Sequence, residues 1–214
     1  MAKRKPNGEF AGIVGNIVLF ERNGEQQMRI KPKKRKDKSA LLFKSRDDFR
    51  TVFVLIKKFK KLIDVGFADQ KKNRSAYHSA LSINRLNFVQ AKKAGLTEKN
   101  DWFQFSDGNL SGATDTSVRR TEDGKIEITW QGTEAGMHAN LSDLAIGCIL
   151  CEDGSFKTGP ENISREAGKM IIVPDKNTVN EKTEVFLSFS VTSTRYKRGS
   201  DENVSKSKWI GVVE

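Results

Sequence analysis

The residue types that carry most catalytic and metal chemistry are scarce in this chain. It contains two histidines, His78 and His138, and two cysteines, Cys148 and Cys151. A catalytic nucleophile needs a base within hydrogen-bond reach, but no nucleophile elbow or other catalytic signature accompanies either histidine. The sequence therefore predicts a protein that is not an enzyme and has no catalytic residues.

The two cysteines have the spacing of a zinc or redox pair, Cys148-Ile-Leu-Cys151. A zinc site needs about four ligands, and the chain has neither a second cysteine pair nor a histidine pair. A redox pair normally opens a helix, whereas this pair lies in an apolar run typical of a strand. Side chains three apart on a strand point to opposite faces, so we predict two reduced structural thiols, no disulfide, no metal and no cofactor.

Basic residues form the strongest pattern in the sequence. The net charge is +11, and residues 1–100 hold 25 basic and 9 acidic residues against 13 and 18 in residues 101–214. Seven of the ten residues in 29–38 are basic, and Pro32 together with self-repulsion favours an extended arm there. Such an arm can follow a phosphate backbone without reading its sequence. The alternative is a solvated linker, or an arm that crosses an acidic neighbouring subunit.

The predicted contact residues are the basic side chains of the N-terminus, of the arm and of the outer side of the first helix. They are Lys3, Arg4, Lys5, Arg29, Lys31, Lys33, Lys34, Arg35, Lys36, Lys38, Arg50, Lys57, Lys60 and Lys61. No zinc finger, ribonucleoprotein aromatic motif or helix-turn-helix accompanies them, so any binding to nucleic acid would be non-specific.

Residues 1–100 carry the signals of a hairpin followed by two helices. Asn23-Gly24 between β-prone runs predicts a β-hairpin over 17–30. Ser45 is the expected N-cap of a first helix, and Gly66 is its expected C-cap. One apolar stripe follows that helix, and we expect its members to be core rather than stacking platforms for bases: Phe49, Val52, Phe53, Ile56, Phe59 and Ile63.

A second helix is predicted from about Ser75 to Lys93, ended by Gly95. Asn84 lies in its apolar stripe, where we expect it to bond a neighbouring backbone group rather than a ligand. After residue 100 the hydrophobic period changes to two, with strands expected around 126–130, 144–150, 170–173 and 185–191.

The predicted fold class is therefore α+β. An N-terminal β-hairpin and an α-helical hairpin precede an antiparallel immunoglobulin- or fibronectin-like β-sandwich of about seven strands. The predicted domains are a basic hairpin, arm and two-helix region over residues 1–100 and the sandwich over residues 101–214.

The chain also resembles an uncharacterised family of Bacteroidota proteins along nearly its whole length. The resemblance rests on Phe10-Ala-Gly-Ile-Val-Gly-Asn16, Arg29-Ile-Lys-Pro-Lys-Lys34, Ile63-Asp-Val-Gly-Phe67, Ala80 with Asn84, and Ser106 with Leu110. The chain departs from the family in its more heavily basic segment 33–38 and in having fewer small residues before the first helix. The resemblance implies the order of elements and no activity.

The start of the chain does not read as an export signal. Its basic residues precede an apolar stretch that glycines interrupt, and no cleavage site follows. No run reaches the roughly 18 apolar residues of a membrane helix. We therefore expect no signal peptide, no membrane span, and a place in the cytoplasm or within an assembled particle.

These observations favour a non-catalytic structural protein of an intracellularly assembled particle, such as a virion or a phage-tail-like assembly. The basic N-terminal half would contact nucleic acid or acidic neighbouring subunits, and the protein would be a homo-oligomer or part of a larger assembly. One alternative is a stand-alone, non-specific nucleic-acid-binding protein. Another is a surface adhesin or carbohydrate-binding sandwich that uses Trp102 or Trp209; Trp130 follows a core pattern and is expected to be buried.

Overall fold

The structure is a computed structural model of the whole chain. It describes residues 3–4, 10–22, 24–33, 39–69, 74–96, 98–132, 138–175, 178, 181–197, 200 and 203–214. Its strands are β1 Lys3–Arg4, β2 Phe10–Val14, β3 Ile17–Arg22, β4 Glu25–Ile30, β5 Ser117–Arg120, β6 Ile126–Thr129, β7 Leu144–Cys151, β8 Phe156–Thr158, β9 Lys169–Ile172, β10 Thr183–Ser190 and β11 Lys208–Val213. Its helices are α1 Ala40–Lys58, α2 Lys60–Gly66 and α3 Ala76–Lys93, with short 3-10 turns at Lys99–Asp101 and Arg165–Ala167.

The fold is mixed α+β, with three α-helices and three antiparallel sheets among the described residues. The chain divides into two compact units, an N-terminal unit of residues 1–43 and a C-terminal unit of residues 44–214. The division into domains at residue 100 stays a prediction beside these units. Within the described part of the chain, no helix is both long and apolar enough to cross a membrane.

The N-terminal unit is a four-stranded antiparallel sheet in the order β1-β2-β3-β4. The predicted hairpin is confirmed, because β3 pairs with β4 and Arg22 stands opposite Glu25. Gly24, in the intervening turn, has a φ of +81°, a conformation that glycine adopts without a steric penalty. The backbone N–H of Lys31 donates to the carbonyl of Asn16 at 2.7 Å, which holds the start of the basic arm against the β2–β3 turn.

The first helix is present, but its predicted start is wrong. Helix α1 begins at Ala40, so Ser45 lies inside it, and the hydroxyl of Ser39 accepts the N–H of Leu42 at 3.3 Å. The apolar stripe is only partly buried: Phe59 is fully enclosed, whereas Phe49 and Phe53 are each 38% exposed. Their rings stack on each other on the surface side of the stripe.

The second helix agrees with the sequence. Helix α3 starts after Ser75, whose hydroxyl accepts the N–H of His78, and Gly95 follows its end with a φ of +78°. Asn84 bonds backbone as expected: its amide nitrogen donates to the carbonyl of Gln104 at 2.8 Å, and its amide oxygen accepts the N–H of Gln104 at 2.8 Å. This buried pair ties the helix to the chain that leads into the strands.

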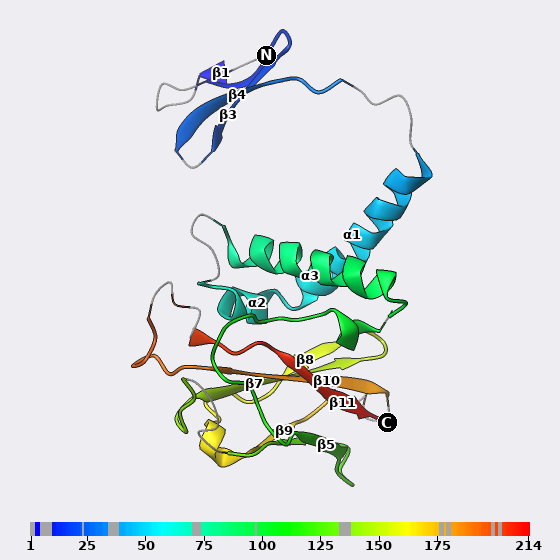
Figure 1. Cartoon of the computed structure of the whole chain (residues 1–214), viewed down its shortest axis with the longest axis vertical. Helices are drawn as coiled ribbons and strands as arrows, with labels where there is room; N and C mark the ends of the chain where they lie inside the picture. Colours follow the sequence, from blue (N-terminus) through cyan, green and yellow to red (C-terminus); the bar gives the residue numbers. More distant parts are fainter. Residues whose placement is uncertain are drawn as a thin grey trace. The chain divides into compact units, whose positions relative to one another are not determined.

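The C-terminal unit has three layers (Figure 1). Helices α1, α2 and α3 lie on one side of a sheet with the strand order β11-β10-β7-β8. A sheet with the order β5-β6-β9 lies on the other side. Neighbouring strands are antiparallel throughout, and β10 carries a register irregularity between Val185 and Phe186 opposite β11.

Two apolar clusters hold these layers together. The first joins the helices to the central sheet around Phe59, whose ring centroid lies 4.3 Å from that of Phe156 and 4.5 Å from that of Phe103. The second fills the space between the two sheets. Cys148 belongs to the first cluster and Cys151 to the second, so the two thiols point to opposite faces of β7 as predicted, and both are free.

Gly66 has a different role from the predicted C-cap. It is the last residue of α2, Phe67 is the cap residue, and the carbonyl of Gly66 accepts the N–H of Asp107 at 3.1 Å. A Cβ at this position would lie 2.4 Å from the carbonyl oxygen of Phe105 and 2.5 Å from Cβ of Ser106. The glycine therefore permits close contact between α2 and the segment that follows α3.

Gly66→Ala should destabilise the protein, because the neighbours of the new methyl group are backbone and cannot swing aside. We expect a loss of about 1–3 kcal/mol, the usual cost of overpacking, measured by denaturant unfolding. Gly112→Ala is the control, since a Cβ there meets nothing within 4 Å and should change stability by less than about 1 kcal/mol. Equal stability of the two variants would contradict this account of Gly66.

Candidate functional site

The predicted basic contact residues fall into two groups that lie in different units. In the N-terminal unit, Arg29 is the last residue but one of strand β4, and Lys31 and Lys33 lie just after the strand. All three side chains are exposed. Lys3 and Arg4 form strand β1. The remaining residues of this group lie outside the described residues: Lys5, Lys34, Arg35, Lys36 and Lys38.

The second group lies on the helices of the C-terminal unit. Arg50 and Lys57 are on α1, Lys60 and Lys61 are on α2, and all four side chains are exposed. The turn at Phe59 separates the two helices, so these cations do not follow one continuous helix as the sequence analysis assumed.

The sheet of the N-terminal unit gathers most of its exposed apolar side chains on one face. Its register places Val14, Ile17 and Ile30 in one row across three strands, and Leu19 with Met28 in the next row. Because side chains alternate along a strand, these rows share one face with Phe10. We call this surface the apolar face; it consists of Phe10, Val14, Ile17, Leu19, Met28 and Ile30.

The opposite face of the same sheet carries the arginines of β3 and β4. Arg22 and Arg29 alternate onto it, and the Arg29 guanidinium carbon lies 5.6 Å from the centroid of the Phe20 ring. Ile13 and Val18 also lie on this face. No described residue of the N-terminal unit is buried, so neither face of the sheet has an apolar core of its own.

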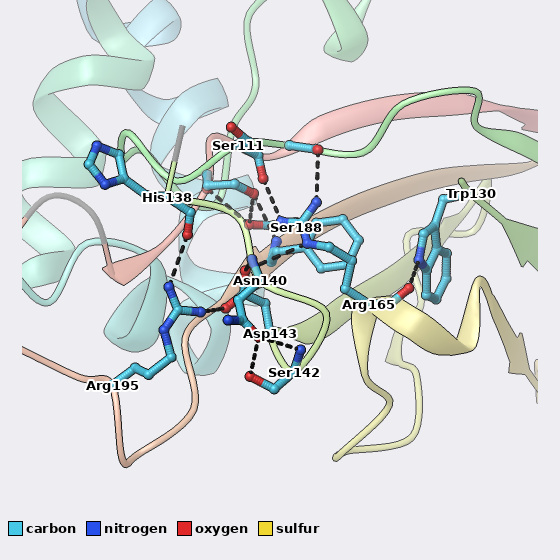
Figure 2. A network of polar contacts seen from close by, with 12 residues as sticks. Ser111, Trp130, His138, Asn140, Ser142, Asp143, Arg165, Ser188 and Arg195 are labelled. Atoms are coloured by element: carbon cyan, nitrogen blue, oxygen red, sulfur yellow. Dashed lines mark hydrogen bonds and ion pairs between the residues drawn. The ribbon is translucent and has the colours of Figure 1, made fainter. Parts of the chain in front are cut away.

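The C-terminal unit contains a buried ionic network that the sequence analysis missed (Figure 2). Arg165 is almost completely buried, and its Nε lies 3.6 Å from Oδ2 of the fully buried Asp143. The guanidinium donates to the carbonyls of Ser111 at 2.6 Å and Gly112 at 3.1 Å, and stacks 3.9 Å from the ring centroid of Phe189. These contacts join four segments distant in the sequence.

Further contacts complete the network. The side chain of Asp143 accepts from Arg195 and from the backbone N–H of Asn140, and Arg195 donates to the carbonyl of His138 at 3.0 Å. Trp130 donates its indole N–H to the carbonyl of Arg165 at 2.8 Å. Burial lowers the pKa of Arg165, and the charge of Asp143 acts against that change. The network serves to fix loops, since its charged groups are engaged with one another and with backbone carbonyls.

The other residues with chemical potential also have structural roles. The Ser75 hydroxyl lies 2.7 Å from Nδ1 of His78, but this contact is part of the N-cap of α3. Burial raises the pKa of the Cys148 thiol well above its usual value, which disfavours the reactive thiolate. Among the described residues, no group of three or more histidine, cysteine or acidic side chains is arranged to hold a metal ion.

A groove in the C-terminal unit holds two of the three tryptophans. Its volume is about 470 Å³, and its lining includes Asn87, Gln90, Asn100, Trp102, Lys206 and Trp209. The indole nitrogens of Trp102 and Trp209 are buried and have no hydrogen-bond partner among the described residues. Trp130 lies elsewhere, buried as predicted. Trp102 is only 4% exposed and Trp209 is half-buried, so the groove offers one accessible indole ring beside side-chain amides and the charged Asp101 and Lys206.

Removing the charge of Asp143 should destabilise the protein strongly, because Arg165 would remain buried without its counter-ion. We expect Asp143→Asn to cost about 3–5 kcal/mol in denaturant unfolding. Asp175→Asn is the control, since Asp175 pairs with Lys157 on the surface at 2.8 Å, and its loss should cost less than about 1 kcal/mol. A small effect of Asp143→Asn would show that the network is not a structural clamp.

Among known proteins, the chain is similar to one family. Residues 9–211 match DUF6266, a family of unknown function. No curated protein and no solved structure matches the chain. Because the match spans almost the entire sequence, from the sheet of the N-terminal unit to the last strand of the C-terminal unit, the chain belongs to the DUF6266 family.

Proposed function

We propose that the protein is a non-catalytic structural component of a particle that assembles inside the cell. In this proposal the basic N-terminal region contacts a polyanion, either nucleic acid or the acidic surface of a neighbouring subunit. A place in the cytoplasm or in the assembled particle is part of the same proposal.

One observation carries this proposal: Arg29 near the end of strand β4, and Lys31 and Lys33 just after it, are exposed and have no acidic partner among the described residues. Some cations of the C-terminal unit are paired, as Lys169 and Arg119 are with Glu127. Their hydrogen bonds lower the pKa of that carboxyl group. Like the first three cations, those predicted as contacts on the helices are in no ion pair among the described residues: Arg50, Lys57, Lys60 and Lys61. Exposed cations without counter-ions are suited to contact phosphates or carboxylates from outside.

The C-terminal unit would serve as the scaffold, and we propose that its strands form a fibronectin-like sandwich. Its first, second and fifth strands make one sheet, and its third, fourth, sixth and seventh make the other. This distribution, with one apolar cluster between the sheets, supports the proposal. Helices α1 to α3 are an addition that covers the outer face of the larger sheet.

The test is the salt dependence of binding to a duplex DNA of random sequence. Changing Arg29, Lys31 and Lys33 to Gln should weaken binding and reduce the slope of log affinity against log salt by about 2.7, because each neutralised phosphate contributes about 0.9. The comparison variant changes Arg50, Lys57 and Lys61 to Gln, which removes three exposed cations of the helices that are also predicted contact residues. Fluorescence anisotropy gives both slopes.

Each outcome identifies the anionic partner. A reduced slope in the first variant alone supports contact through the N-terminal unit. A reduced slope in the helix variant alone would place the contact on α1 and α2 and contradict its assignment to the N-terminal unit. If DNA is not bound at low salt but self-association of the protein weakens with salt and with the first variant, the partner is an acidic neighbouring subunit.

The tryptophan groove favours a second candidate function, the binding of a neutral carbohydrate. Side-chain amides and aromatic rings suit hydroxylated ligands, which offer both hydrogen-bonding groups and apolar C–H surfaces. Titration with maltotriose, cellotriose and chitotriose, followed by tryptophan fluorescence, should give saturable binding that Trp209→Ala weakens at least tenfold. Val212→Ala, on the same strand but outside the groove, should not change it. No saturable change with any of the three sugars would rule out this candidate.

A further inference from the structure

We propose that the apolar face of the N-terminal unit packs against the same face of a second copy of this chain. The sheet would then be half of a face-to-face, two-fold symmetric interface. The inference rests on the proposed assembly function and names the contact that joins two subunits.

The apolar face is exposed in the N-terminal unit. Its most exposed members, Met28 and Ile30, are 72% and 74% exposed, and Phe10, Val14 and Ile17 are also largely accessible. The register sets them side by side in rows on neighbouring strands, so they form one patch rather than scattered residues. Contiguous apolar patches of this kind mark interaction sites on monomeric proteins.

The sheet of the N-terminal unit has no buried core among its described residues. A small isolated sheet gains little stability in water unless a hydrophobic face is covered. In the N-terminal unit no described side chain is buried, although its strands are rich in valine, isoleucine and phenylalanine. A covering surface would supply the apolar burial that these strands lack.

The distribution of charged residues over the two faces of the sheet favours a second copy of the chain as the molecule that covers the apolar face. The two rows of the apolar face that join Val14, Ile17 and Ile30 and Leu19 with Met28 contain no charged residue. The charges lie beyond one end of these rows, where Glu21 shares the face and Arg4 of β1 pairs with Phe10, whereas Arg22 and Arg29 lie on the opposite face. Two identical surfaces can meet only if like charges do not oppose each other, and the two uncharged rows meet this condition. A nucleic acid would instead bind the side that carries the arginines.

The size and shape of the apolar face suit an interface between two copies. Five of its six side chains are between 42% and 74% exposed, so two copies that meet through this face can bury most of it; a standard interface buries about 800 Å² on each partner. Two sheets pack face to face about 10 Å apart with their side chains interdigitated. Rows of valine, isoleucine and methionine provide side chains of suitable length for this packing.

The first experiment is sedimentation velocity of the full chain over a range of concentrations. The unmodified protein should show a concentration-dependent dimer, and Ile17→Lys should raise its dissociation constant at least tenfold. Ile13→Lys is a closely matched control: Ile13 and Ile17 are 41% and 42% exposed, but they lie on opposite faces of the sheet. The control should change the dissociation constant by less than about threefold.

A cross-linking experiment keeps the inference testable if the lysine variants unfold the sheet. Met28→Cys should be cross-linked between copies by a bismaleimide with an arm of about 10 Å, the separation of packed sheets. Gln27→Cys places the thiol on the opposite face and should give little cross-linked dimer. The native thiols do not interfere, because Cys148 and Cys151 are buried.

The outcomes separate this inference from the proposed function. A monomer at every concentration, equal effects of Ile13→Lys and Ile17→Lys, or equal cross-linking of the two cysteine variants would overturn the inference. The salt dependence of DNA binding in the Arg29, Lys31 and Lys33 variant is measured independently of all three results. A dimer that forms through another surface would therefore refute the inference while leaving the assembly function in place.

Discussion

The central constraint on the C-terminal unit is that strands β7 and β10 have apolar side chains on both faces. Phe186 points toward the helices, whereas Val185 and Leu187 point toward the second sheet. A sheet of this kind is stable only when both faces are covered. The helices supply one cover and the three-stranded sheet supplies the other, so the helices share a core with the strands.

The docking of the helices depends on specific contacts with the segment that follows α3. Asn84 bonds both backbone groups of Gln104, Gly66 admits the backbone of Phe105, and the hydroxyl of Ser106 bonds Ser188 and the carbonyl of Ser205. Buried polar groups of this kind are costly if unpaired, so they specify one arrangement rather than many. Three of the positions that carried the family resemblance, Gly66, Asn84 and Ser106, take part in this arrangement.

The N-terminal unit presents the opposite situation, a sheet whose described residues have no cover of their own. Most of its exposed apolar residues lie on one face, and the other face combines Arg22 and Arg29 with Ile13 and Val18. In the C-terminal unit the apolar surface of the strands is enclosed by other elements of the same unit. The difference explains why we attribute scaffolding to one unit and contacts with other molecules to the other.

The sequence was most informative where local chemistry determines structure. The hairpin of β3 and β4, the Ser75 cap and the opposite faces of the two cysteines all follow from backbone geometry and the alternation of a strand. The start of α1 was predicted wrongly because Ser45 is of a residue type that often caps helices. Ser39, whose hydroxyl accepts the N–H of Leu42 at the actual start, lies just after the basic arm and has no comparable sequence pattern around it.

Residues that act through distant contacts could not be predicted in this way. Asp143 and Arg165 meet only because two loops converge, and their spacing in the sequence has no periodic meaning. The groove between Trp102 and Trp209 likewise depends on how the segment after α3 lies against β11. Phe49 and Phe53 lie at the surface because α3 covers only part of α1. The apolar stripe of α1 alone does not determine how far this cover extends.

The placement of the two thiols has a practical consequence for following the opening of the C-terminal unit. Cys148 is enclosed between the helices and the central sheet, and Cys151 is enclosed between the two sheets. A thiol reagent can reach each sulfur only when the corresponding layer separates. The rates at which the two sulfurs are labelled would therefore report separately on detachment of the helical layer and on parting of the sheets, without any engineered cysteine.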